Sequence, residues 1–559
     1  MRRVVKILLW SLLTLLLLVV LVPIGVGGYL LATADLMEPA LQVDTAHYEV
    51  QLSADSVRRV GDNSLRKNEY GLWEARIVGT AQERGAVLGL LARDLIEFQE
   101  RVFVDAIYDL VSSERYVRFL HKLVRIFNGR MAQHIPLEFR EEIAAMALSC
   151  SHRYDAFGSP YERQINYHAA HDIGHAMQDY MLVGCSSFAV WGTSSEDGEL
   201  LVGRNFDFYV GDDFARNKLV LAVEPSEGHC FVSVTWPGMV GVLSGMNERG
   251  LTVTINAAKG ALPTSTAMPI SLLAREILQF AATIDEAYAI AQRRQTFVSE
   301  SLLIASAEDR KAAVIEKSPE KIALRYAEED RLISTNHYLS ETFADEAFNR
   351  ENIATSDSPY RYARVEELLS RYAPLTAEEA AAVLRDRRGV GDRAIGLTNE
   401  KALNQCISHH GVIFQPEKRL MWLSTAPWQA GAMLCYDLNQ IFANDKTTDR
   451  MLYDPSLTIE ADTTFLALDY LRVVAHRALS KQLREALDAE QPIEWDLCDS
   501  LLKNNPHYYG VYDLVGDVAA RDGAIETAIT HWQRALECEI PRLGEREAIE
   551  QKITDYGTR

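Results

Sequence analysis

Short β-rich runs separated by turn signals fill residues 185–260, and this pattern limits the possible folds more than any other feature of the chain. Two or three more strands are expected between residues 301 and 337, and a last hairpin at 409–426. Helical periodicity occupies 270–293 and 360–387. Helices gathered between two runs of strands favour stacked antiparallel sheets covered by helices over a doubly wound parallel sheet.

Both flanks of this region are expected to be mainly helical. Residues 66–182 begin with a strand and continue as amphipathic helices, and the chain from about 455 onward has helical periodicity. Residues 508–541 resemble one tetratricopeptide unit, which cannot bury its own apolar face. We therefore expect a helical cap on the main domain rather than a partner-binding array. The small and large positions of the unit are Gly516, Ala519, Ala528, Trp532 and Ala535.

The N-terminus has the charge pattern of a membrane anchor. "MRRVVK" carries three positive charges, and residues 7–34 contain none of either sign. A spanning helix needs about 20 apolar residues, whereas the apolar part of a signal peptide has about 7–15. "ATAD" at 32–35 resembles a cleavage site, so a removed signal peptide is the alternative to an uncleaved anchor. Basic residues before the run place the body of the protein outside the cytoplasm.

Charge and cysteine usage exclude several classes of protein. The chain of 559 residues has a formal net charge of -21, which argues against a nucleic-acid partner. Its seven cysteines are scattered without a C-x-x-C pair, so they indicate neither a disulfide framework nor a zinc site. One of them can therefore be a reactive thiol.

Cys185 is the candidate, because it follows Gly184 at the start of the first β-rich run, in "GCSSFAVWG". A cysteine is a strong nucleophile only as thiolate, which requires a base and positive surroundings. "GRNFDF" supplies Arg204 and Asp207 one strand later. Polar residues also stand where later strands end or a helix begins, a place where functional groups are often presented. They are Asn256 in "TVTINAAKG", Asn336 in "LISTNHY" and Arg361 in "SPYRYARVEELL".

Taken together and in this order, these motifs resemble the Ntn hydrolases of the acyl-CoA:6-aminopenicillanate acyltransferase-like and choloylglycine hydrolase group. The resemblance covers roughly residues 66–430 and includes "GLWEARIVGTAQERGAVLGLL" near its start. It implies an α+β fold, a four-layer αββα sandwich. The domains are then an anchor at 1–35, a mostly helical N-terminal part at 36–184, a catalytic core at 185–450 and a helical region at 451–559.

The resemblance also implies a role for each candidate residue. Cys185 matches the nucleophile, which becomes a new N-terminus when the chain cuts itself after Gly184. The freed α-amino group, with an ordinary pKa near 7.7–8.0, is a suitable base for the thiol. Arg204 and Asp207 match the pair that steadies thiolate and amino group. The backbone N–H of Asn256 and the side chain of Asn336 match the oxyanion hole, and Arg361 matches a second active-site arginine.

The sequence thus predicts a membrane-anchored, self-processing hydrolase that cleaves a linear amide through a thioester on Cys185, with acyl transfer to an amine as the close variant. We expect no cofactor, an amphiphilic small-molecule substrate, and a protein partner only if the C-terminal helices bind one. Two alternatives stay open. One is a catalytically inactive helical-repeat scaffold. The other is a metal phosphohydrolase that uses His168, His171 and His175 of "HAAHDIGH".

Overall fold

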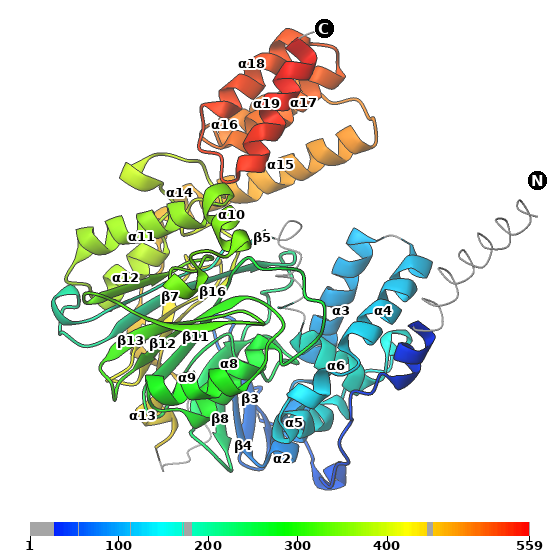
Figure 1. Ribbon diagram of the computed structural model, residues 1–559, viewed down its shortest axis with the longest axis vertical. Helices are drawn as coiled ribbons and strands as arrows, with labels where there is room; N and C mark the ends of the chain where they lie inside the picture. Colours follow the sequence, from blue (N-terminus) through cyan, green and yellow to red (C-terminus); the bar gives the residue numbers. More distant parts are fainter. Residues whose placement is uncertain are drawn as a thin grey trace, which may run out of the picture.

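The structure is a computed structural model that describes residues 27–53, 55–111, 113–169, 172, 182–443 and 451–557. Two stacked β-sheets form its centre (Figure 1). The larger has eleven strands, in the order β1 Gln51–Leu52, β2 Arg58–Val60, β3 Asn63–Lys67, β4 Trp73–Gly79, β8 Leu219–Pro225, β9 Phe231–Thr235, β10 Ser244–Asn247, β11 Leu251–Ala257, β12 Glu300–Ser306, β13 Lys311–Lys317 and β14 Ile322–Tyr326.

The smaller sheet has eight strands, and the strand predicted directly after Cys185 lies next to its edge. Its order is β15 Arg331–Ser334, β6 Ser186–Val190, β7 Leu201–Tyr209, β16 Ser408–Gln415, β17 Leu420–Ser424, β18 Met433–Asp437 and β19 Tyr453–Ile459, while β5 Leu182–Val183 pairs separately with β7.

Apolar side chains fill the space between the sheets. Val202 and Val412 from the smaller sheet meet Val220 and Val314 from the larger one in a single buried cluster. Because side chains alternate across a strand, the other half of each strand faces outward and needs its own cover.

Helices supply that cover on both sides. α8 Ile270–Phe280 and α9 Ile284–Arg293 pack on the larger sheet, and α11 Ser358–Tyr372 and α12 Ala377–Leu384 pack on the smaller one. α10 Ala347–Thr355 precedes α11, and the short α13 Leu438–Ile441 follows β18. The resulting helix–sheet–sheet–helix order is the α+β architecture that the motifs implied.

The N-terminal part contributes strands as well as helices. β4 pairs in parallel with β8, so that Trp73 lies opposite Leu219, and β1–β3 extend the larger sheet beyond it. These strands belong to the segment at 36–184, whose other elements are mainly helical. Its helices are α2 Ala81–Leu91, α3 Arg93–Leu110, α4 Glu114–Asn128, α5 Leu137–Ala147 and α6 Pro160–His168.

The C-terminal region is helical, but it begins later than predicted. Residues 453–459 form the strand β19 beside β18, because their backbone completes the edge of the smaller sheet. The helices then follow above the core (Figure 1) as α14 Thr463–Leu468, α15 Tyr470–Asp488, α16 Trp495–Asn504, α17 Tyr509–Arg521, α18 Ile525–Leu536 and α19 Leu543–Gly557.

The residues of the tetratricopeptide-like unit pack against one another. Ala519 on α17 shares a buried cluster with Ala528, Trp532 and Ala535 on α18. Gly516 lies so close to Trp532 that a Cβ there would stand 2.4 Å from its indole nitrogen. The small residue thus permits the close approach of the two helices.

Within the described residues we find no helix that combines the length and the apolar character needed to cross a bilayer. Residues 1–26 of the predicted anchor at 1–35 lie outside the described residues.

Candidate active site

Cys185 lies at a break in the strand that runs along β7. Residues up to Val183 pair with β7 as β5, and pairing resumes at Ser186 as β6. Between them, the Gly184 N–H donates to the Asp207 carbonyl at 3.1 Å. The Cys185 side chain is fully buried, and burial raises the pKa of its thiol.

Arg204 supplies the positive charge beside the thiol. Its Nη2 lies 3.7 Å from Cys185 Sγ, which opposes the effect of burial on the thiol pKa. The guanidinium also donates to Ser244 Oγ at 2.7 Å and to the Ile255 carbonyl, and it stacks 4.3 Å above the ring of Phe206. These contacts reach from the smaller sheet to β10 and β11 of the larger one, and they fix the guanidinium between the sheets.

His409 and His410 form a hydrogen-bonded pair, and His410 lies beside Arg204. His410 Nε2 lies 2.9 Å from Ser244 Oγ and 3.4 Å from Arg204 Nη1. Since the guanidinium can only donate, the Ser244 hydroxyl donates to His410 Nε2, which leaves the His410 proton on Nδ1. His410 then donates to His409 Nδ1 at 2.8 Å. Burial lowers the pKa of both histidines, so both are neutral.

Asp207 is a fully buried carboxyl. It stands three positions after Arg204, so its side chain leaves the opposite face of β7. The nearby Ser408 hydroxyl, which lies 3.2 Å from the carbonyls of Phe206 and His410, and the charges of Arg361 and Arg204 act to lower the pKa of Asp207. Burial raises the pKa of Asp207 to about 7. A cation placed beside this carboxyl would stabilise its charged form.

Arg361 on α11 reaches the backbone of the nucleophile. Its Nη1 donates to the Cys185 carbonyl at 2.6 Å and to Ser186 Oγ at 3.0 Å, and its Nη2 donates to Asn336 Oδ1 at 2.8 Å. Asp357 holds the guanidinium through Nε at 2.7 Å. The two terminal nitrogens of Arg361 thus converge on the break in the strand and on Asn336.

Asn336 and Asn256 complete the hydrogen-bond network around Cys185. Asn336 Nδ2 donates to the Ala257 carbonyl at 2.8 Å. Asn256 Nδ2 donates to Ser187 Oγ at 2.7 Å and to the Ser334 carbonyl at 3.0 Å, and so ties β11 to the smaller sheet. Arg204 and Arg361 therefore both contact Cys185, Arg361 joins Asn336 to it, and Asn256 fixes the strand that starts beside it.

The motifs did not indicate Ser244, His410 or Asp357, which position the two arginines. The adjacent histidines of "SHHG" were a visible signal, since two ionisable rings inside a predicted apolar hairpin require partners. In the structure this segment carries an irregularity in pairing with β7 between Ser408 and His410.

His168, which the sequence suggested as one ligand of a metal site, is not available to bind a metal. Its Nε2 accepts from the Val240 N–H at 2.9 Å and its Nδ1 lies 2.8 Å from the Gln164 carbonyl, so neither nitrogen has a lone pair left for a metal. Burial lowers its pKa to about 4. His171 and His175 lie outside the described residues. Among the residues that are described, no group of three or more potential ligands can hold a metal.

A buried cysteine at a strand break, held between two arginines inside an αββα sandwich, is the arrangement expected of an Ntn-type hydrolase. Comparison with known families agrees, because residues 193–426 match the family described as acyl-coenzyme A:6-aminopenicillanic acid acyl-transferase. The resemblance drawn from the motifs is thereby confirmed over this part of the chain.

Two curated relatives match this chain with low sequence identity. An uncharacterized protein of Archaeoglobus fulgidus is 26% identical over 55% of this chain and 57% of its own length. Protein dcd1B of Dictyostelium discoideum is 23% identical over 41% of this chain and 46% of its own length. The chain therefore spans about half the length of the curated relatives that it matches.

Solved structures with some similarity include two amide hydrolases. One is the Caenorhabditis elegans ortholog of N-acylethanolamine-hydrolyzing acid amidase, with 16% identity, a TM-score of 0.31, and coverage of 42% of this chain and 93% of the other. The other is a mutant conjugated bile acid hydrolase from Clostridium perfringens, with 13% identity, a TM-score of 0.32, and coverage of 46% and 93%.

Proposed function

We propose that this chain is a self-processing cysteine hydrolase that cleaves a linear carboxylic amide through a thioester on Cys185. The observation that carries the proposal is the placement of Cys185 at the break between β5 and β6, with Arg204 at its sulfur and Arg361 on its carbonyl. The family match over residues 193–426 supports the same class of reaction.

The first reaction is cleavage of the chain itself. The Cys185 thiol attacks the Gly184 carbonyl, so that an S–C bond forms while the C–N bond breaks and the nitrogen takes up the proton. Water then hydrolyses this thioester, leaving a carboxyl on Gly184 and an amine on Cys185. Arg361 holds the Cys185 carbonyl during these steps and so fixes the scissile peptide against the thiol.

Self-cleavage also accounts for the buried Asp207 carboxyl. The new α-amino group appears next to Gly184, whose N–H already donates to the Asp207 backbone. A protonated amine there would supply a further donor and a further positive charge, and would bring down the raised pKa of this carboxyl. Asp207 can then orient the amine as the base for the thiol.

Amide hydrolysis follows from the same groups. The α-amino group takes the thiol proton, the thiolate attacks the substrate carbonyl, and the amine product leaves with that proton. The Asn336 amide and the Asn256 backbone N–H are proposed to bind the oxyanion. Water completes hydrolysis, whereas an acceptor amine would complete acyl transfer. No step requires a cofactor, and the proposal includes none.

The setting of this activity is also a proposal. The uncharged run at residues 7–34 would tether the protein to a membrane, with the catalytic body outside the cytoplasm and an amphiphilic substrate within reach. The C-terminal helices would serve mainly as a cap on the core. A catalytically inactive scaffold is the alternative, but a scaffold has no need for two buried arginines converging on one cysteine.

A product assay tests the proposal. Purified protein is incubated with N-acyl amides that differ in chain length and amine, with and without an added acceptor amine, and released acid, amine and new amide are measured. We expect hydrolysis that iodoacetamide and Cys185→Ala abolish, while Cys435→Ala, a buried cysteine in β18, retains it. Hydrolysis that survives Cys185→Ala would rule out the thioester mechanism.

A further inference from the structure

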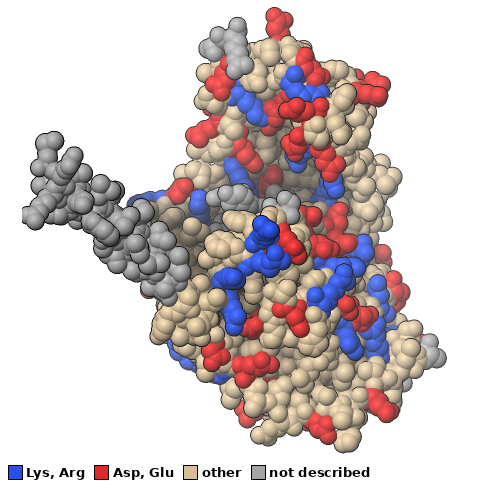
Figure 2. Space-filling model, turned by 90° about the vertical axis from the view of Figure 1, so that its right-hand side faces the viewer, with Lys and Arg blue, Asp and Glu red and all other residues tan. Residues whose placement is uncertain are grey.

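A cleft of about 1180 Å³ lies between the core and the C-terminal helices. Its wall on the core side includes Leu72 and Trp428, and its wall on the other side includes Tyr470 and Val474 of α15 and Tyr508. The α15 wall lies outside the residues that match the family. Figure 2 views this side of the molecule and shows Lys and Arg side chains gathered on the core below the C-terminal helices.

Lys218 lines this cleft and is a buried cation without a counter-ion. Only 4% of the residue is exposed, and its Nζ makes one long hydrogen bond, to the Ser424 carbonyl at 3.3 Å. Among the described residues, no carboxylate lies within 4.0 Å of Nζ. Burial alone lowers the pKa of Lys218, to about 8. A buried ammonium with one weak partner is costly, so its retention calls for an anion that the chain does not supply.

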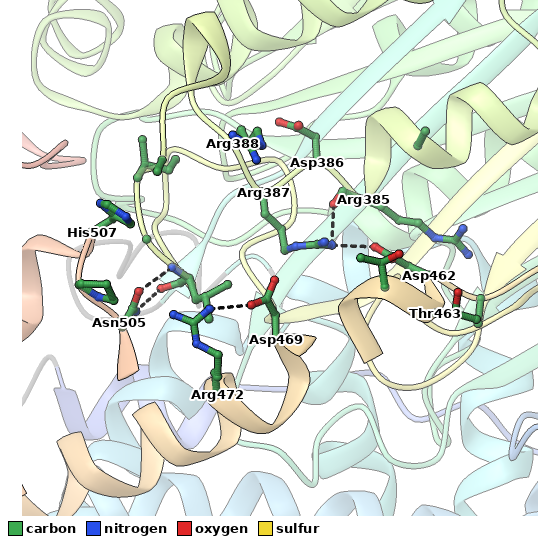
Figure 3. A pocket seen from close by; sticks show the side chains of 18 of the residues that line it. Arg385, Asp386, Arg387, Arg388, Asp462, Thr463, Asp469, Arg472, Asn505 and His507 are labelled. Atoms are coloured by element: carbon green, nitrogen blue, oxygen red, sulfur yellow. Dashed lines mark hydrogen bonds and ion pairs between the residues drawn. The ribbon is translucent and has the colours of Figure 1, made fainter. Parts of the chain in front are cut away.

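A neighbouring cleft serves as a comparison for the charged side chains around Lys218. It has a volume of about 710 Å³ and is lined by Arg385, Arg387, Arg388 and Arg472 (Figure 3). There Arg387 pairs with Asp462 at 2.8 Å and Arg472 with Asp469 at 2.8 Å. Two of these arginines are thus paired with the protein's own carboxylates, and Arg385 and Arg388 donate to backbone carbonyls, whereas Lys218 makes one long hydrogen bond.

The surroundings of Lys218 define the kind of anion that fits. The cleft is also lined by five further cations, Lys67, Arg216, Arg477, Lys481 and Arg484, and by four carboxylates, Asp212, Glu400, Glu485 and Asp488. Arg477 pairs with Asp212 at 3.3 Å and Lys481 with Glu485 at 3.8 Å, whereas Lys218 has no ion-pair partner among the described residues. Aromatic and aliphatic side chains also line the cleft, which is large enough for a drug-sized molecule. A small inorganic ion would leave these apolar walls exposed to water.

We propose that this cleft binds an amphiphilic anion, with its carboxylate or equivalent group on Lys218 and its apolar body against the apolar side chains that line the cleft, among them Val474 of α15. The site does not include Cys185 and does not depend on the proposed amide hydrolysis. The C-terminal helices then have a purpose beyond covering the core, because α15 forms one wall of the binding site.

Calorimetric titration of the full chain with decanoate tests this site. We expect decanoate to bind the wild-type chain, and Lys218→Met to weaken binding by about 10- to 100-fold because a charge-assisted hydrogen bond is lost. Lys481→Met is the matched control, since Lys481 lines the same cleft with its side chain 77% exposed. It should change the affinity less than about threefold.

Two further measurements separate ligand binding from a structural role of Lys218. Decanol, which has the same chain without the charge, should bind at least about tenfold more weakly than decanoate. Without ligand, Lys218→Met should melt at or above the wild-type temperature, because it removes an uncompensated buried charge. Equal decanoate affinity for the wild-type chain and Lys218→Met, equal affinity for decanol and decanoate, or a lower melting temperature of Lys218→Met would overturn the proposal.

Discussion

At the scale of single residues, Arg361 makes the contacts that most directly define the reacting peptide. Its guanidinium joins the Cys185 carbonyl, Ser186 Oγ and the Asn336 side chain, and Asp357 holds it in place. A planar fork can make these contacts at once, whereas an ammonium group at the same place can make only some of them.

Arg361→Lys should therefore slow both self-cleavage and amide hydrolysis by about 10²–10³-fold, the usual loss when an aligned donor is removed. Gel separation of the two fragments over time measures the first rate, and product release measures the second. Arg371→Lys is the control, because Arg371 lies on the same helix with its side chain 39% exposed. Equal rates in the two variants would contradict this role of Arg361.

Asp207 gives the uncleaved chain a distinctive dependence on pH. Burial raises the pKa of this carboxyl to about 7 in the folded chain, against about 3.9 in the unfolded one. The stability it contributes is fully present below about pH 4 and is lost as the pH rises through about 7.

We compare Cys185→Ala with Cys185→Ala/Asp207→Asn, so that neither chain can cleave itself. Between pH 5 and 8 the free energy of unfolding of the first should fall relative to that of the second, by on the order of a few kcal/mol. Urea titrations at several pH values measure this difference. Parallel pH profiles would mean that Asp207 is not held in its neutral form.

At the scale of elements, close helix packing depends on particular small residues. Gly516 on α17 faces Trp532 on α18, and the indole nitrogen donates to Asp517 at 3.1 Å. A larger side chain at 516 must displace the indole or separate the two helices.

Gly516→Val should therefore destabilise the C-terminal helices by about 1–3 kcal/mol, the usual cost of overpacking. Gly544→Ala on α19 is the control, because nothing lies within 4 Å of the Cβ it would add. Urea unfolding followed by tryptophan fluorescence measures both. If the two variants unfold alike, the packing of α17 on α18 does not limit stability.

The elements also show which parts of the fold can be predicted from local pattern. Runs such as 251–257 have continuous apolar and β-branched residues and form a buried strand as expected. β19 was missed because only two of its seven residues are buried and its role comes from pairing with β18. The parallel pairing of β4 with β8 joins segments more than a hundred residues apart, which no local pattern specifies.

The candidate site divides in the same way. Cys185, Arg204 and Asp207 stand close together in sequence and could be selected from their residue types. Arg361 approaches Cys185 across 176 residues; its place at the start of a helix singled it out, but only resemblance to a family predicted its role beside the cysteine. Lys218 and His410 were not selected, because burial without a counter-ion and hydrogen bonding between sheets are visible only in the folded chain.

At the scale of the whole molecule, the C-terminal helices are fastened to the core by a small set of polar contacts. Glu539 pairs with Lys401 at 2.7 Å and with Arg393 at 2.8 Å, and Asn505 exchanges two hydrogen bonds of 2.9 Å with the Leu397 backbone. The pKa of Glu539 is lowered because these cations outweigh its burial.

Glu539→Gln should make the C-terminal helices open more often, because it removes both ion pairs from one partly buried position. Hydrogen exchange at residues 393–405 should become about three- to thirtyfold faster. Glu537→Gln is the control, since Glu537 pairs with Arg534 on an exposed surface. Unchanged exchange in Glu539→Gln would show that other contacts hold the two parts together.

The central claim is that Cys185 cuts the chain at its own amino side and then serves as the N-terminal nucleophile. Intact mass measurement with N-terminal sequencing of the purified full chain tests it most directly. We predict two associated fragments that meet between Gly184 and Cys185, the second beginning with Cys185, and a single intact chain for Cys185→Ala. A wild-type chain that stays uncleaved while it hydrolyses amides would contradict the claim.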